Sequence, residues 1–380
     1  MVPAKRGPVT NERRSAQTFC VSSSTGAGKR PSVKIVWAAS YGGRHRGSFI
    51  PALESVARRV IARGDRLDIV VPDVGPAAWH DEVRAQGIGV QIVANARGAA
   101  RATRALQPDV VHAHFDNWLA AVTLALWPSR ARLLWHIHST RQPDGGPLRR
   151  TPARRIKFGL IGARVARMIC VTETIAAEVH ELGAATGKII VVRNAVDGVR
   201  FHPPDPATRA AMRARLGLDG QPAIAFFGRD PAIKGADFLA AALADVPKVT
   251  VVAVATPESA RTAIARHAPV VDVPFVEDVR DVLWAVDAIA IPSRGEGMPY
   301  VALEALACGV PVVATDLDWA QELARDSNAV RLARRDDPGS LARALRATLA
   351  APPPPAQLPG GGIERWTDEI VALYDGAAAV

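Results

Sequence analysis

Two glutamates in the C-terminal half of the sequence have the type and spacing to bind a polar ligand. Glu296 and Glu304 are separated by seven residues in the stretch 291–316, IPSRGEGMPYVALEALACGVPVVATD. Short apolar runs at both ends of this stretch predict buried strands, and the segment between them predicts a helix. Pro299 suits the first position of that helix, and Gly309 suits the residue just past its end. The stretch therefore predicts a βαβ unit.

Glu304 is the charged residue of an otherwise apolar helix, which should be buried on most sides. A buried carboxylate is costly unless it is hydrogen-bonded, so Glu304 needs either the hydroxyls of a ligand or an arginine from elsewhere in the chain. The position of Glu296 favours a ligand, rather than an arginine, as the partner of Glu304. Glu296 lies beside Gly297 at the carboxyl end of the first strand, just before the helix N-terminus, where free amides attract anions. A carboxylate beside such amides suits a phosphorylated sugar.

The segment 292–314, PSRGEGMPYVALEALACGVPVVA, resembles without gaps the signature of the retaining group 1 (family 4) glycosyltransferases of GT-B architecture. The resemblance implies that Glu296 lies against the donor sugar and that Glu304 holds the ribose of the nucleotide. It also implies donor-binding positions at the three residues after Glu296, which are Gly297, Met298 and Pro299.

Strand-like apolar runs alternate with helical stretches through the first 200 residues, beginning with VKIVWAA at residues 33–39. Strands at this spacing indicate a parallel, Rossmann-like sheet, and the pattern repeats after residue 221. With the resemblance, the predicted fold is α/β with two Rossmann-like domains facing a cleft. The predicted divisions are a disordered leader (1–32), an N-terminal acceptor-side domain (33–196), a nucleotide-sugar-binding domain (197–350), a linker (351–362) and a C-terminal helix that returns to the first domain (363–380).

The first domain offers three further positions for ligand contact. Gly42 and Gly43 follow the first predicted strand and would let the backbone approach a ligand closely. A glycine pair is most often only a turn, but the resembled family carries paired glycines here that face the donor phosphates. His138 ends another strand at its carboxyl tip, where parallel sheets bind ligands. A capped surface histidine is the alternative, and the resemblance favours His138 over His136 as the residue that reaches the donor sugar.

Two cations follow the first predicted strand of the second domain. Arg229 lies beside Gly228, and Lys234 lies beside Gly235. An arginine fork and a lysine point charge can together neutralise a diphosphate, although isolated cations are more often solvated surface charges. Because the Gly-Arg and Lys-Gly pairs match the resembled family, both are predicted to stabilise the departing diphosphate. The predicted catalytic residues are Glu296, His138, Arg229 and Lys234.

Three patterns that suggest cofactor or metal sites are predicted to be neither. The sequence GAGK at residues 26–29 lacks the Ser or Thr that follows the lysine of a phosphate-binding loop. His112 and His114 have no further ligand nearby with convincing spacing, so they are interpreted as a strand end. Asp316 and Asp318 follow the last strand of the βαβ unit and are interpreted as loop residues. No metal and no cofactor is therefore predicted, and a nucleotide-diphosphate sugar would be the co-substrate.

Composition limits the choice of partners. The chain has 380 residues and a net charge of +10, but its basic residues are spread out without interleaved aromatics, which argues against nucleic acid. Contact with an anionic membrane surface explains the net charge better, and a bias of the genome toward Arg codons is an alternative explanation. The basic stretch 141–157 is the predicted contact with a membrane or acidic acceptor. No apolar run long enough for a membrane span and no secretory signal is present, so a cytoplasmic protein, peripheral on the inner membrane face, is expected.

The predicted function is transfer of a sugar from a nucleotide-diphosphate donor to an acceptor hydroxyl, with retention of anomeric configuration. A lipid-linked glycan of envelope polysaccharide or glycolipid synthesis is one acceptor, and a small molecule such as a secondary metabolite is another. A phosphorylase or epimerase on the same fold, and a non-catalytic nucleotide-sugar-binding partner, remain alternatives. The base is not predicted, because VPFVEDVRDVLWAVD at residues 273–287 departs from the family pattern around the base-binding turn.

Overall fold

The structure is a computed structural model that describes residues 31–140, 150–218, 220–276, 278–354 and 362–376. Most of the predicted leader, including the GAGK sequence, lies outside the described residues. So do residues 141–149 of the basic stretch, residues 355–361 of the predicted linker and the last four residues of the predicted C-terminal helix. None of the described helices has the length and apolar character that a membrane crossing requires.

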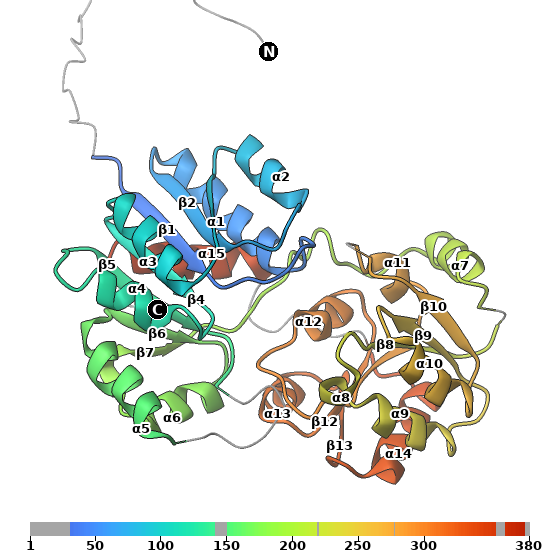
Figure 1. Ribbon diagram of the computed structural model, residues 1–380. Helices are drawn as coiled ribbons and strands as arrows, with labels where there is room; N and C mark the ends of the chain where they lie inside the picture. Colours follow the sequence, from blue (N-terminus) through green and yellow to red (C-terminus); the bar gives the residue numbers. More distant parts are fainter. Residues whose placement is uncertain (1–30, 141–149, 219, 277, 355–361, 377–380) are drawn as a thin grey trace, which may run out of the picture. The chain divides into compact units, whose positions relative to one another are not determined.

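A seven-stranded, wholly parallel sheet is built by the N-terminal half in the order β3-β2-β1-β4-β5-β6-β7 (Figure 1). Its strands are β1 (Lys34–Ala39), β2 (Arg66–Pro72), β3 (Gly89–Val93), β4 (Val110–His114), β5 (Arg132–Ile137), β6 (Arg167–Cys170) and β7 (Ile189–Val191). The helical segments between them are α1 (Phe49–Ala62), α2 (Trp79–Ala85), α3 (Ala96–Ala105), α4 (Leu119–Ala125), α5 (Pro152–Arg155), the π-helix η1 (Ile156–Ile161), the 3₁₀ turn η2 (Gly162–Arg164), α6 (Glu173–Glu181) and the 3₁₀ turn η3 (Thr186–Lys188).

A second parallel sheet, of six strands, has the order β10-β9-β8-β11-β12-β13. Its strands are β8 (Ala223–Phe227), β9 (Thr250–Val254), β10 (Val270–Val273), β11 (Ala288–Ile291), β12 (Val312–Thr315) and β13 (Val330–Ala333). The remaining helices are α7 (Pro206–Arg215), α8 (Pro231–Lys234), α9 (Ala236–Leu243), α10 (Glu258–Ala265), α11 (Arg280–Leu283), α12 (Tyr300–Ala307), α13 (Asp318–Asp326), α14 (Pro338–Ala350) and α15 (Gly362–Tyr374). The predicted pair of Rossmann-like α/β domains is confirmed.

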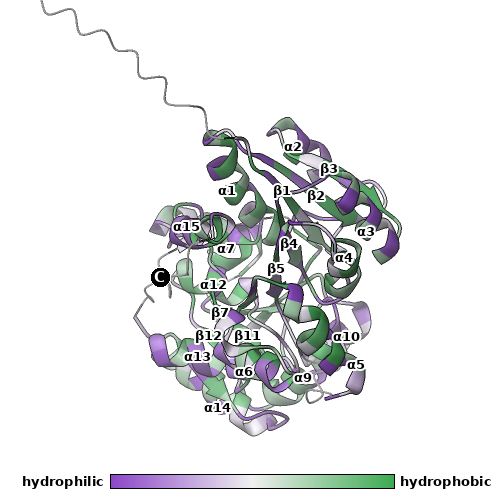
Figure 2. Ribbon diagram, turned by 90° about the vertical axis from the view of Figure 1, so that its left-hand side faces the viewer, coloured by the Kyte–Doolittle hydropathy of each residue, from purple (hydrophilic) through white to green (hydrophobic). Residues whose placement is uncertain are grey.

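Both sheets reverse their direction of growth in the middle, between β1 and β4 in one and between β8 and β11 in the other. In parallel sheets, ligands bind beyond the carboxyl ends of the strands at such a reversal. The strands themselves are largely buried, and the helices around them are amphipathic, with purple and green faces in Figure 2. The topology therefore points to the loops after these four strands as the place for a site.

The stretch 291–316 forms the predicted βαβ unit, from the end of β11 through α12 to β12. Pro299 is the residue before the first helical residue rather than the first one, a shift of one position. Gly309 takes a left-handed backbone conformation with φ of +75°, which a residue without a Cβ adopts easily. The chain can then turn directly from α12 into β12.

The last helix, α15, packs against α1 in the N-terminal half, and Figure 1 shows it in red among the blue elements. The hydroxyls of Ser55 and Thr367 lie 2.7 Å apart at this contact. Deeper in the core, the indole nitrogen of Trp37 on β1 donates to the hydroxyl of Tyr374 at 2.8 Å. The hydroxyl of Tyr374 also lies 3.0 Å from Nδ1 of His112 on β4. The chain thus closes its first domain with residues from its far end.

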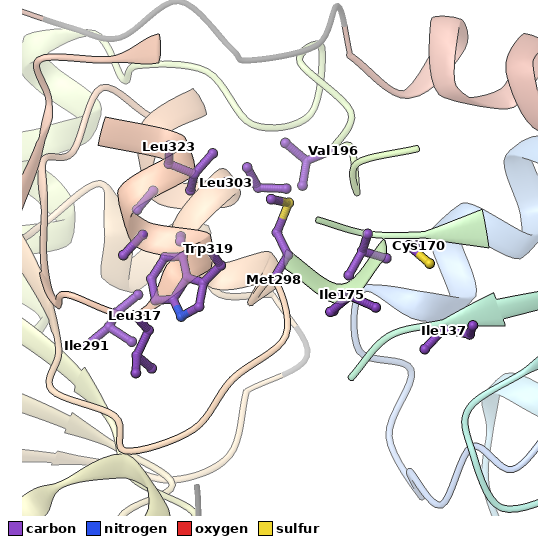
Figure 3. Close-up of a cluster of buried hydrophobic side chains, with 14 of the residues drawn as sticks. Ile137, Cys170, Ile175, Val196, Ile291, Met298, Leu303, Leu317, Trp319 and Leu323 are labelled. Atoms are coloured by element: carbon purple, nitrogen blue, oxygen red, sulfur yellow. The ribbon is translucent and has the colours of Figure 1, made fainter. Parts of the chain in front are cut away.

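Apolar side chains join the two halves behind the strand ends. Met298 and Leu303 of the second half lie near Ile175 and Val196 of the first half (Figure 3). All four side chains are buried. Nδ2 of Asn194 donates to the carbonyl of Met298 at 2.9 Å. This packing holds the loop before α12 against the N-terminal half.

Replacement of Tyr374 by Phe should lower the free energy of unfolding by about 1–3 kcal/mol, because it leaves buried nitrogens of Trp37 and His112 without their shared partner. Urea denaturation measures the change. Arg365→Gln on the same helix is the control, since it removes only an exposed ion pair with Glu369 and should cost at most about 0.5 kcal/mol. Equal effects of the two substitutions would contradict the role given to the buried hydroxyl.

Candidate active site

A cavity of about 550 Å³ lies between the two halves, within the range typical of small-molecule sites. The N-terminal half contributes side chains from the loop after β1 and from the start of α1. The second half contributes the loop after β8, the segment after β10 and one face of α12. Its polar and aromatic lining includes Tyr41, Arg46, Ser48, Glu54, Arg58, Arg200, Arg229, Lys234, Phe275, Tyr300 and Glu304. Three of the predicted site residues, Arg229, Lys234 and Glu304, therefore share one cavity.

Glu304 is buried on α12 and is 5% exposed. Burial raises the pKa of its carboxyl to about 7, while a hydrogen bond from Ser48 and the charge of Arg200 oppose the rise. The hydroxyl of Ser48 donates to Oε1 of Glu304 across the cavity. Ser48 stands at the N-terminus of α1, but its side chain does not cap that helix. Its hydroxyl can therefore reach across the cavity to Glu304. The partner of Glu304 within the chain is thus a hydroxyl rather than an arginine.

Lys234 and Glu296 form an ion pair, although they come from different loops of the second domain. Oγ of Ser293 donates to the same oxygen of Glu296 at 3.1 Å. Gly235 brings the two loops together: its φ is +71°, and a Cβ there would lie 2.0 Å from the carbonyl oxygen of Pro292. Only glycine permits this approach, which sets Lys234 beside the carboxylate.

An aromatic ring borders the cavity on the side of Arg229. Phe275 lies just after β10, and the guanidinium of Arg229 is 5.8 Å from the centre of its ring, within cation–π range. The imidazole of His45 stacks on the other half's Phe275 with ring centres 3.9 Å apart. Tyr41 lies near this group, and burial raises the pKa of its phenol to about 12 against the opposing charge of Arg229. The cavity therefore combines cations with flat aromatic surfaces.

The other predicted site residues do not line this cavity. A Cβ on Gly43 would lie 2.6 Å from the ring of Tyr41, so close packing of that ring explains the glycine without a ligand. A Cβ on Gly42 would meet nothing within 4 Å. Met298 buries its side chain in the core between the halves, and Pro299 directly precedes α12.

Gly297 and His138 meet through their backbones, beside the cavity. A Cβ on Gly297 would lie 1.8 Å from the carbonyl oxygen of His138, so the loop before α12 is seated directly on the end of β5. Glu296 and Gly297 border a separate small pocket with Ser139 and Thr172. The structure thus brings Glu296, Gly297 and His138 together at the junction of the halves, and Lys234 links this group to the main cavity.

Four histidines lie side by side beneath this junction: two come from β4, one comes from β5, and His138 directly follows β5. Parallel pairing sets His114 opposite His136, and His112 and His138 lie on the same face. Burial lowers all four pKa values, those of His112 and His138 to about 3. Nδ1 of His114 lies 3.3 Å from Nε2 of His138, which fixes the ring of His138 against its neighbour. The four imidazoles therefore form a neutral aromatic floor.

The sequence indicated no third metal ligand near His112 and His114, but the fold brings one close to them. Ring nitrogens of His112, His114 and His136 all lie within 4.8 Å of one another, a spacing that could hold a metal ion. His136 comes from the next strand, and strand register cannot be read from spacing along the chain. In contrast, Asp316 accepts a hydrogen bond from the amide of Arg335 at 3.1 Å, as a loop carboxylate would.

Sequence reasoning missed several residues of the cavity, among them Ser48, Tyr41, Arg200 and Phe275. Ser48 before a helix is typical of an ordinary cap, and nothing local shows that its hydroxyl reaches a glutamate 256 positions later. Phe275 lies in the segment that departs from the family pattern, so no motif marked it. The one available signal was a single aromatic residue two positions after the end of β10.

Two family models match the chain. The model for Glycosyltransferase Family 4 matches residues 52–200, and the model for Glycosyl transferases group 1 matches residues 221–351. Among solved structures, Anabaena HepE in complex with UDP and glucose is similar with a TM-score of 0.73 at 18% identity, over 91% of this chain and 100% of that chain. The fold is that of a GT-B glycosyltransferase.

Curated relatives agree with the family models. A D-inositol 3-phosphate glycosyltransferase of Mycolicibacterium gilvum is 30% identical over 312 residues, which cover 75% of this chain and 70% of that protein. A D-inositol 3-phosphate glycosyltransferase of Xylanimonas cellulosilytica is 31% identical over 301 residues, which cover 70% of this chain and 71% of that protein. The chain belongs to the group 1 (family 4) glycosyltransferases of GT-B architecture, and it is a glycosyltransferase.

The buried histidines predict a specific acid sensitivity. Their folded-state pKa values lie below the ordinary value near 6.5, so on acidification the unfolded chain takes up protons that the folded chain does not. The free energy of unfolding should therefore decrease as the pH is lowered from 6.5. The decrease is up to about 1.4 kcal/mol per pH unit for each imidazole. Glu304, with its raised pKa, holds an extra proton in the folded chain between about pH 4.5 and 7 and offsets one imidazole.

Urea denaturation at about pH 7.5, 6.5 and 5.5 measures this dependence. His136→Phe removes one buried imidazole. The slope of the free energy of unfolding against pH should therefore decrease by the amount that corresponds to about one bound proton. A slope that is flat below pH 6.5, or that His136→Phe does not change, would contradict burial of neutral rings.

Proposed function

We propose that the chain transfers a sugar from a nucleotide-diphosphate donor to an acceptor hydroxyl with retention of anomeric configuration. The observation that carries this proposal is the shared cavity of Glu304, Arg229 and Lys234. A buried carboxylate suits the hydroxyls of a ribose, and two cations suit a diphosphate. Phe275 beside Arg229 offers a flat apolar surface for a nucleobase.

In the proposed complex, the ribose hydroxyls replace Ser48 as donors to Glu304. The diphosphate lies between Arg229 and Lys234, and the donor sugar extends toward Glu296, which Lys234 already contacts. The acceptor oxygen bonds to the anomeric carbon as the bond from that carbon to the diphosphate breaks. The acceptor proton passes to a phosphate oxygen of the leaving nucleotide. Catalysis then consists chiefly of positioning and of preorganised positive charge.

Three further arginines of the cavity support an anionic acceptor. Arg46 and Arg200 line the cavity, although each already pairs with a carboxylate, Glu54 and Asp278 respectively. Arg58 lines it as well, with no ion pair among the described residues. A phosphorylated polyol, the acceptor class named for the curated relatives, and a lipid-linked glycan with a phosphate group both fit such cations.

Product analysis tests the reaction. The chain is incubated with a panel of nucleotide sugars and either a phosphorylated polyol or a membrane lipid extract, and products are identified by mass spectrometry and NMR. We expect transfer from one donor with the anomeric configuration unchanged. Inversion would contradict the retaining mechanism, and a sugar phosphate or an isomerised donor formed without acceptor would instead indicate a phosphorylase or epimerase. No turnover with any donor would favour a non-catalytic binding partner.

Lys234→Ala should lower kcat/KM by about 100-fold or more, since it removes a cation that stabilises charge on the leaving diphosphate. Initial-rate kinetics measure the loss. Lys34→Ala is the matched control, because Lys34 is exposed on β1 outside the cavity, and its activity should remain normal. Unchanged turnover of the Lys234 variant would overturn the assignment.

Nucleotide binding alone should stabilise the chain. At about 100 times Kd, a bound nucleoside diphosphate adds about 2.7 kcal/mol to the free energy of unfolding. A thermal-shift panel of UDP, GDP, ADP, TDP and CDP should therefore reveal the preferred base. Glu304→Gln should weaken that shift, because the carboxylate is the proposed ribose acceptor. A flat response of the unmodified chain to all five would contradict the donor site.

A further inference from the structure

Two neighbouring helical segments of the N-terminal half expose large apolar side chains. Of the seven large hydrophobic side chains exposed in the described part of the chain, four lie on or just after α4 and on η1. They are Leu124, Trp127, Ile156 and Leu160, with exposed fractions of 54%, 46%, 53% and 67%. Their gathering in two short segments sets this region apart from the scattered apolar residues that any surface carries.

Polar contacts hold η1 alongside α4. Nζ of Lys157, near the start of η1, donates to the carbonyl of Asp116 before α4 at 2.7 Å. Arg164, just after η1, donates to the carbonyl of Ser129 after α4 at 2.7 Å. The two segments therefore run in the same direction, side by side. Phe158 between them is fully buried, so Ile156 and Leu160 project on the side of η1 away from the core.

Exposed arginines border these apolar side chains. On α3, which packs along α4, Arg97, Arg101 and Arg104 are exposed at helical spacing. Arg130 after α4 and Arg155 before η1 are also exposed. None of the five forms an ion pair with a carboxylate among the described residues, whereas the exposed arginines Arg59, Arg215 and Arg365 do. These five arginines and the four apolar side chains make up the α3–α4–η1 surface.

We propose that the α3–α4–η1 surface binds the face of an anionic lipid bilayer. Tryptophan and leucine side chains enter the boundary between headgroups and acyl chains, and arginines remain at headgroup level. Arginines that lack a carboxylate partner keep their full attraction for anionic lipid. A second copy of the chain is a poorer occupant, because a two-fold contact would set five arginines against the same five.

This inference does not rest on the proposed reaction, since membrane binding is measured without donor or acceptor. It differs from the sequence-based prediction, which placed membrane contact in the stretch 141–157. Here most of the charge comes from α3, which is remote from that stretch in the sequence. α4 follows the carboxyl end of β4, at the edge of the sheet that faces the cavity.

Co-sedimentation of the full chain with vesicles tests the proposal. Vesicles of phosphatidylcholine alone are compared with vesicles that also contain phosphatidylglycerol. Measurements at about 0.01 M and about 1 M salt span Debye lengths of about 30 and 3 Å. We expect binding to the anionic vesicles, little binding to the neutral ones, and release at high salt. Absence of binding to anionic vesicles at low salt would overturn the proposal.

Matched variants separate the contribution of this surface to vesicle binding from that of the net charge of the chain. Replacement of Arg97, Arg101 and Arg104 by Gln should weaken binding about 100-fold, at about fivefold for each arginine. The control replaces Arg266, Arg325 and Arg343 of the second half by Gln, which removes the same charge from exposed positions. An equal loss in the control would show that only net charge matters and would overturn the assignment.

The apolar part has its own control. Ile156→Ser with Leu160→Ser should weaken binding at least tenfold, whereas Val199→Ser, at a highly exposed apolar position elsewhere, should not. Circular dichroism confirms that each variant is folded. If the unmodified chain is a dimer that the Ile156 and Leu160 changes dissociate, the surface is a contact between copies and the proposal fails.

Discussion

A carboxylate buried in an apolar helix must find a hydrogen-bond donor, and much of this molecule follows from how Glu304 finds one. Its hydrogen-bond donor comes from the other half of the chain, from Ser48 just before α1. That bond spans the cavity and ties the two sheets together at their ligand-binding edges. A ligand that displaces Ser48 gains only the difference between two hydrogen bonds, so the rest of its affinity must come from the cations and aromatic rings around it.

Close backbone contacts fix the loops around the site, one between the two halves and one within the second half. Gly297 lies against the carbonyl of His138, and Gly235 lies against the carbonyl of Pro292. At both positions a methyl group would collide with main chain, which cannot move aside as a side chain can. Lys234, Glu296 and the end of β5 are therefore held by close backbone packing. Such rigid support suits a site that acts through fixed charges.

The sequence predicted the elements well and their cross-chain contacts poorly. Alternating apolar runs and helical periods identified both sheets, and Gly309 and Pro299 marked the ends of α12 to within one residue. Arg229, Lys234 and Glu304, which share the cavity, could be singled out because each stands in a local motif. Ser48, Phe275 and the approach of His136 to His112 could not be found, because they depend on strand register and on packing between distant segments. Met298 sat in the right motif, but its side chain packs in the core between the halves.

The pairing of α15 with α1 also bears on how the chain folds as it is made. Trp37 and His112 reach their hydroxyl partner only when residue 374 is present, and by then the entire second sheet has been synthesised. Domains usually fold in the order in which they leave the ribosome. In this chain the first domain emerges early, yet its core stays open until α15 has been synthesised, while the second domain can complete its own core first. The N-terminal domain is thus the last to be finished.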